Sequence, residues 1–132
     1  MTNEEHALIK YRMDRAKETI DEAVLLFEAG HINTYVNRLY YACFYAASAL
    51  LLLKDFSTSK HSHLRSLLHK EFVKPGIIPT KLGKHFDILF DNRQEGDYGD
   101  YTKFKVDEVK GWLEQTLDFV NQIDIIISRE HG

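Results

Sequence analysis

Hydrophobic side chains in residues 33–54 recur on nearly every side of a predicted helix. A helix that is apolar almost all round is a buried one, so we expect this segment to form the centre of a bundle. Arg38 and several polar residues interrupt it, whereas a membrane span needs about 20 mostly apolar residues. The two apolar sides consist of Val36, Tyr40, Cys43, Phe44, Ala47, Leu50 and Leu51, and of Leu39, Ala46 and Leu53.

Other segments carry a single apolar face each and predict helices packed around the central one. The first covers residues 3–29 and ends at Gly30, and the very short turn after it makes the first two helices antiparallel neighbours. A third helix starts after an N-cap at Thr58 or Ser59, and a fourth has Pro79 in its first turn.

The C-terminal part predicts one more helix, over residues 104–128. Residues 91–103 carry two glycines and almost no aliphatic side chain, so we expect a loop or a fraying helix end there. The apolar face of the last helix is wide, and it forms either part of the internal core or the contact of a C2 homodimer. The predicted fold is an all-α, up-and-down bundle of about five helices in one domain, residues 1–132.

Composition adds constraints on partners and location. The net charge is −3, and no basic block indicates general nucleic-acid binding, so any RNA contact would need a local patch. The acidic, polar N-terminus does not resemble a signal peptide. The one cysteine, Cys43, lies inside the apolar helix, where we interpret it as a small buried hydrophobe. These features fit a cytoplasmic protein with no membrane partner.

The usual motifs of metal and nucleophilic chemistry do not occur in the sequence. Its seven histidines do not follow a zinc-ligand spacing such as HExxH. We find no glycine-rich phosphate loop after a strand and no nucleophile elbow around a serine. We therefore expect no metal and no cofactor.

Two polar groupings stand out against the apolar pattern: Arg38 with Tyr41 on the central helix, and RQEGDY at residues 93–98. In a structural interpretation, Arg38 forms a buried ion pair with Asp97, or Arg93 takes that partner instead.

In a functional interpretation, Arg38 and Arg93 line a cleft together with the hydroxyls of Tyr41 and Tyr98, and this cleft binds a phosphate or a nucleotide. From the residues alone we favour the structural interpretation, because ion-pair networks are often only structural.

The same groupings carry a resemblance to a known family. Residues 37–51, NRLYYACFYAASALL, resemble the central helix of HEPN domains, with its R-x-YY pattern. The segment SKHSHL places His61 at the family's K-x-H position, and LFDNRQEGDYGD is similar to its R-x-x-x-DY box. The three segments occur in the family's order, and the resemblance covers nearly the whole chain.

The resemblance implies a helical bundle that dimerises and a cytoplasmic partner of the minimal nucleotidyltransferase type, in a toxin–antitoxin-like pair. In many HEPN proteins an Arg-x4–6-His motif also makes the domain a metal-independent ribonuclease. Arg93 stands where the motif arginine would be, but Tyr98 follows five residues later and Asp100 seven later, with no histidine between.

Two hypotheses of function follow. We prefer a binding module, in which Arg38, Tyr41, Arg93, Asp97 and Tyr98 hold a nucleotide or phosphate and the dimer engages a nucleotidyltransferase. The alternative is a ribonuclease with relocated acid–base chemistry, in which His61 acts with Arg93 or Arg38. A purely structural role for these residues predicts instead that Arg38→Ala destabilises the fold by about 3–5 kcal/mol.

Overall fold

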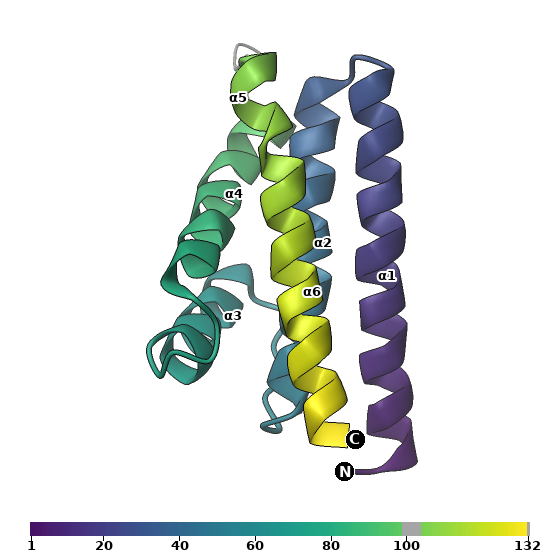
Figure 1. Ribbon diagram of the computed structural model, residues 1–132, viewed down its shortest axis with the longest axis vertical. Coiled ribbons are helices and arrows are strands. Elements are labelled where there is room, and N and C mark those ends of the chain that lie inside the picture. The colour runs from purple at the N-terminus through teal and green to yellow at the C-terminus, as the bar shows by residue number, and fades with distance from the viewer. Residues whose placement is uncertain (99–103, 132) are drawn as a thin grey trace.

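The structure is a computed structural model, and it describes residues 1–98 and 104–131, with the side chains of 94–98 and 131 outside the described part. The described residues form helices and connecting turns, and they contain no strand. The predicted all-α class is confirmed (Figure 1). The helices are α1 (Asn3–Glu28), α2 (Ile32–Leu52), α3 (His61–Leu68), the π-helical turn η1 (His69–Val73), α4 (Thr80–Tyr98), α5 (Val106–Lys110) and α6 (Trp112–His131).

Helix α1 begins with a reciprocal cap. The backbone N–H of Glu5 donates to the Thr2 hydroxyl at 3.1 Å, and the N–H of Thr2 donates to the Glu5 carboxylate at 3.2 Å. The turn after α1 uses Gly30 at φ +82°, a conformation that costs glycine little. The chain then reverses, and α2 runs back antiparallel to α1 (Figure 1), as predicted.

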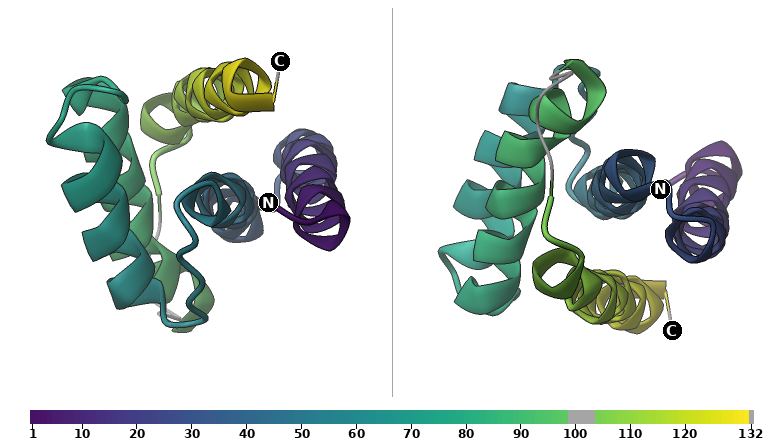
Figure 2. Two further views of the ribbon diagram at one scale, coloured as in Figure 1. Left: turned by 90° about the horizontal axis from the view of Figure 1, so that it is seen from below. Right: turned by 90° about the horizontal axis from the view of Figure 1, so that it is seen from above.

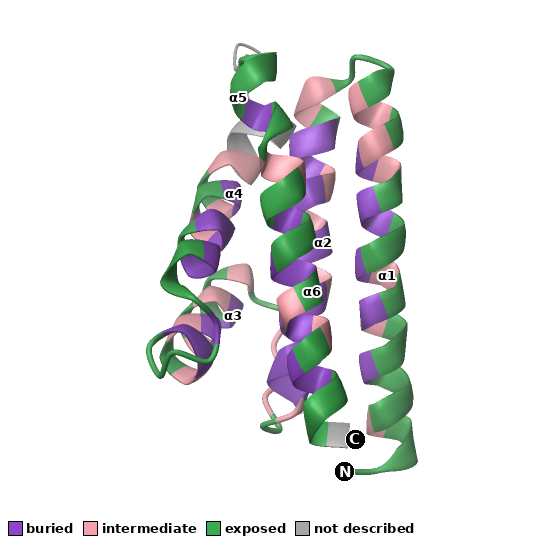
Figure 3. Ribbon diagram, viewed as in Figure 1, coloured by how far each residue is buried: buried purple, intermediate pink, exposed green. Residues whose placement is uncertain are grey.

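Helix α2 is the centre of the bundle, as its all-round apolar pattern predicts. It packs against α1, α3, α4 and α6, which surround it when the molecule is seen along the bundle (Figure 2). Side chains on both predicted sides, such as Leu39, Cys43 and Leu50, are fully buried. On α1 the buried residues instead follow one stripe that faces α2 (Figure 3).

Two details differ from the predictions. The N-cap of α3 is Lys60, and Thr58 lies in the preceding loop, where its hydroxyl accepts a hydrogen bond from the Lys60 N–H at 3.2 Å. Helix α4 continues to Tyr98, so the first part of the segment expected to be a loop or a fraying helix end is helical. The last helix is two helices, because Gly111, a weak helix former, separates α5 from α6.

Most of the wide apolar face of α6 is buried within the chain. Phe119, Val120, Ile123, Ile126 and Ile127 are all buried, in a helix that packs against α1, α2 and α4. Among the described residues, no helix combines the length and the hydropathy that crossing a membrane requires.

Candidate functional site

A hydrogen bond between Tyr40 and His61 joins the central helix to the start of α3. The Tyr40 hydroxyl lies 2.7 Å from Nδ1 of His61. Tyr40 is fully buried on α2, and His61 is the first residue of α3 and is half-buried. A buried tyrosine needs a partner for its hydroxyl, and the loop between the two helices brings the imidazole to it.

Arg93 of α4 also contacts this tyrosine. The Arg93 guanidinium carbon lies 5.3 Å from the centre of the Tyr40 ring and 5.0 Å from that of Phe90, which is cation–π geometry. Its Nε is buried and has no hydrogen-bond partner among the described residues. We call Tyr40, His61, Phe90 and Arg93 the Tyr40 cluster.

The surroundings keep both Tyr40 and His61 uncharged at neutral pH. Burial lowers the pKa of His61, and the positive charge of Arg93 lowers it further. Burial raises the pKa of Tyr40 well above its usual value, although Arg93 acts in the opposite direction. In the tautomer in which the neutral phenol donates to Nδ1, the one N–H of the neutral imidazole lies on Nε2.

Aromatic rings fix the orientation of this imidazole. The Phe44 ring stacks on His61 with 4.4 Å between the ring centres, and Tyr41 meets it edge-on at 5.9 Å. Both aromatic residues come from α2, one turn apart on the side that faces α3. His61 is therefore held from three positions of one helix, by one hydrogen bond and three ring contacts.

Two further arginines flank the cluster and already have partners. Arg65 of α3 lies over Phe90, 4.1 Å from the ring centre, and its NH1 atom is 3.5 Å from the Asp91 carboxylate. Arg38 lies over Tyr41 at 5.1 Å from the ring centre.

Arg38 also bonds to its neighbours on α1 and α2. It donates two hydrogen bonds to the Asn37 side-chain oxygen, at 2.7 and 3.1 Å, and it forms a 3.8 Å ion pair with Glu22. Its described partners are thus Asn37 and Glu22. The expected partner Asp97, like the expected site residue Tyr98, has a side chain outside the described part of the structure.

The remaining reactive side chains have structural surroundings. Burial raises the pKa of Cys43 far above its usual value, so the thiol is inert. His85 and Thr116 form a buried 2.9 Å hydrogen bond, and His69 lies 2.9 Å from Asp87. Within the described residues, no three groups of the metal-binding types gather closely enough to hold an ion.

The sequence did not point to Tyr40 as a site residue, because it belongs to the apolar stripe of the central helix. The available signal was chemical, since a tyrosine at a fully buried position must place its hydroxyl against a polar group. Arg65 and Phe90 gave no such signal, because their contact depends on how α3 packs beside α4.

The comparisons with known proteins assign the family. The model of the HEPN domain matches residues 9–126. This chain belongs to the HEPN domain family. It is 41% identical to a UPF0332 protein of Thermotoga maritima over 125 residues, which are 95% of each sequence.

Two relatives of this protein, both from Methanocaldococcus jannaschii, carry the name "putative toxin". One is 27% identical over 110 residues, which are 83% of this chain and 75% of its own length. The other is 32% identical over 90 residues, which are 68% of this chain and 67% of its own.

The three sequence segments that resemble HEPN domains meet at the Tyr40 cluster. The R-x-YY segment supplies Tyr40, the K-x-H segment supplies His61, and the R-x-x-x-DY segment supplies Arg93. Segments that are far apart in the sequence thus share one location in the fold.

Proposed function

We propose that this HEPN protein is the toxin-like member of a two-protein pair and that its Tyr40 cluster binds the phosphate of a nucleotide or of RNA. The observation that carries the proposal is the position of Arg93, whose guanidinium lies over the ring of Tyr40, the residue that bonds His61. Arginine recognises phosphate through several N–H donors at once.

His61 supplies a second donor to the same anion. With Nδ1 occupied by Tyr40, its Nε2–H is the free end of the imidazole. Arg38 and Tyr41 extend this surface along α2, while Asp97 and Tyr98 belong to the proposed site on the family resemblance alone. The guanidinium groups of Arg93 and Arg38 and the Nε2–H of His61 are hydrogen-bond donors, which suits anion binding better than proton abstraction.

The partner in this proposal is a minimal nucleotidyltransferase, and the HEPN protein acts as a cytoplasmic homodimer. Support comes from the family match and from the two relatives named as toxins. A protein that harms its own cell needs a partner that holds it in check.

Isothermal titration with ATP, GTP and a short RNA tests the phosphate site. We expect Arg93→Gln to weaken binding about tenfold or more, because a charged hydrogen-bond donor is lost. Arg129→Gln, an exposed arginine on α6, is the matched control. Co-purification with a minimal nucleotidyltransferase from the same organism tests the pair. Absence of both kinds of binding would exclude this function.

A metal-independent ribonuclease is the second candidate, favoured by the neutral imidazole beside Arg93. To act as general base, His61 would need the opposite tautomer, with Nδ1–H donating to the Tyr40 oxygen and Nε2 accepting the proton of a ribose 2′-hydroxyl. Arg93 would then steady the charge on the phosphate. This candidate predicts RNA cleavage in EDTA that both His61→Ala and Arg93→Ala abolish. Cleavage that persists in both variants would come from a contaminant.

A further inference from the structure

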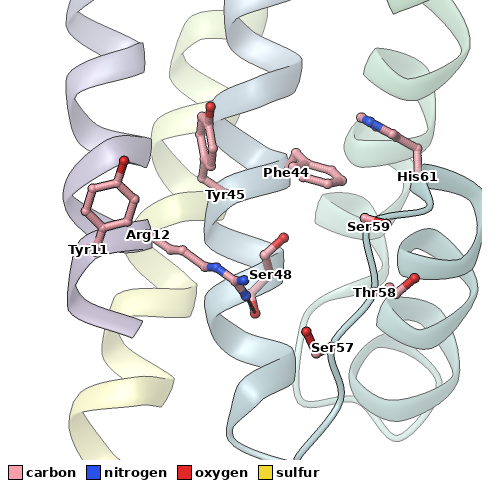
Figure 4. Close-up of a pocket in the computed structure, with 9 residues that line it drawn as sticks. All are labelled: Tyr11, Arg12, Phe44, Tyr45, Ser48, Ser57, Thr58, Ser59 and His61. Atoms are coloured by element: carbon pink, nitrogen blue, oxygen red, sulfur yellow. Dashed lines mark hydrogen bonds between the residues drawn. The ribbon is translucent and has the colours of Figure 1, made fainter. Parts of the chain in front are cut away.

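A pocket adjoins the Tyr40 cluster and shares His61 with it. It has a volume of about 350 Å³, within the usual range of small-molecule sites. Helices α1 and α2 and the loop before α3 enclose it, as Figure 4 shows. The lining residues are Tyr11, Arg12, Phe44, Tyr45, Ser48, Ser57, Thr58, Ser59 and His61.

The lining of this pocket favours an anionic ligand. Although the chain has a net charge of −3, the nine residues include an arginine, a histidine and four residues with aliphatic hydroxyls, and none has a carboxylate. Arg12 takes part in none of the salt bridges formed by the described residues, and its recorded bond is a long one of 3.3 Å to the Ser48 carbonyl. The guanidinium is therefore available to an anion.

Aromatic rings form another part of the pocket. Tyr11 of α1 is 60% exposed, and Tyr45 of α2 is half-buried with the Arg15 guanidinium 5.3 Å from its ring centre. Figure 4 shows both tyrosines beside Arg12, with the hydroxyl side chains of the loop opposite. A planar ring that carries an anionic group matches this combination, because aromatic side chains stack on any nucleobase and arginine binds phosphate.

We infer that this pocket binds one nucleoside phosphate, with the base against Tyr11 and Tyr45 and the phosphate on Arg12 and the loop hydroxyls. The inference rests on the proposed function, because His61 forms a wall of the pocket and is also a donor of the Tyr40 cluster. The nucleoside phosphate comes either from a free nucleotide or from one unit of a single-stranded RNA that passes His61.

Titration calorimetry with 5′-AMP and with an oligoadenylate RNA tests the pocket in the full chain. We expect Arg12→Gln to weaken AMP binding about tenfold or more and Tyr11→Ala about fivefold or more. If Arg12→Gln lowers the melting temperature of the protein, Tyr11→Ala still tests the pocket, because Tyr11 is exposed. Leu25→Ala, a truncation of an exposed residue on the same helix, is the matched control and should leave binding unchanged.

The Arg93→Gln variant separates the two sites. AMP binding that survives in Arg93→Gln and is lost in Arg12→Gln supports the pocket. RNA binding that needs Arg12, without AMP binding, also supports it and identifies RNA as the source. Binding that is lost in Arg93→Gln but unchanged in Arg12→Gln and Tyr11→Ala contradicts the assignment to this pocket and leaves the proposed function standing. No binding of either ligand overturns both.

Discussion

The Tyr40 hydroxyl lies 2.7 Å from Nδ1 of His61, so a residue of the buried central helix bonds a histidine at the edge of the bundle. The phenol is fully buried and the imidazole is half-buried. Their contact turns a core position into part of a polar site. It also decides which end of the histidine faces a ligand.

Tyr40→Phe tests this relationship with little change in shape. We expect the free energy of unfolding to fall by about 1 kcal/mol, the usual value of one hydrogen bond. We also expect the pKa of His61 to rise, because its neutral form loses a donor to Nδ1. Nitrogen NMR of the imidazole during a pH titration measures the tautomer and the pKa. An unchanged Nε2–H tautomer and pKa in Tyr40→Phe would refute the role of the phenol.

Arg38→Ala separates the structural interpretation of Arg38 from the functional one. The ion pair between Arg38 and Glu22 is 3.8 Å long and partly exposed, and such pairs contribute little. With the Tyr41 contact included, we expect a loss of about 1 kcal/mol in urea unfolding. A loss of about 3–5 kcal/mol would show that Arg38 takes part in a buried ion pair.

The central helix shows how much of this protein the sequence predicts. Its all-round apolar pattern predicted burial, and α2 is the core helix. The caps and turns were less accessible, since Thr58 and Ser59 both resemble N-caps, yet the loop positions Lys60 there. Helix α4 continues to Tyr98 despite a glycine, whereas the polar pattern left open whether this segment is a loop or a fraying helix end.

The site was predictable only in part for a similar reason. Arg93 and His61 were identified from the family resemblance, but their meeting at Tyr40 depends on how α3 and α4 pack against α2. A pattern of buried positions also cannot show that one buried residue carries a hydroxyl bound to a histidine. Arg12 was not among the candidate residues, and its place in a pocket depends on the position of the loop before α3.

His85 should make stability depend on pH below neutrality. Burial lowers the pKa of His85 to about 4, whereas an unfolded histidine titrates near 6.5. As the pH falls through this window the unfolded state binds a proton that the folded state does not, so stability falls, by up to about 3 kcal/mol. Urea unfolding at pH 7 and pH 4.5 measures the difference. His85→Gln should show a smaller decrease, and an equal decrease would contradict the assignment.

Two glycines provide a matched pair for the packing of the bundle. A Cβ on Gly83 would lie 3.0 Å from both methyl groups of Val73 and 3.2 Å from His69, whereas a Cβ on Gly111 meets nothing within 4 Å. Gly111→Ala should gain roughly 0.5–1 kcal/mol of helix propensity. Gly83→Ala should lose about 1 kcal/mol, because overpacking outweighs the same gain. Thermal unfolding compares them, and two stabilised variants would show that α4 and η1 pack less closely.

The most direct test of the phosphate site is nitrogen NMR of the Arg93 guanidinium group and the His61 Nε2–H during titration with a short RNA. We predict that both resonances shift together and saturate at the same ligand concentration, because both groups donate to one phosphate. Binding of the RNA with neither resonance moving would contradict the assignment of phosphate binding to the Tyr40 cluster.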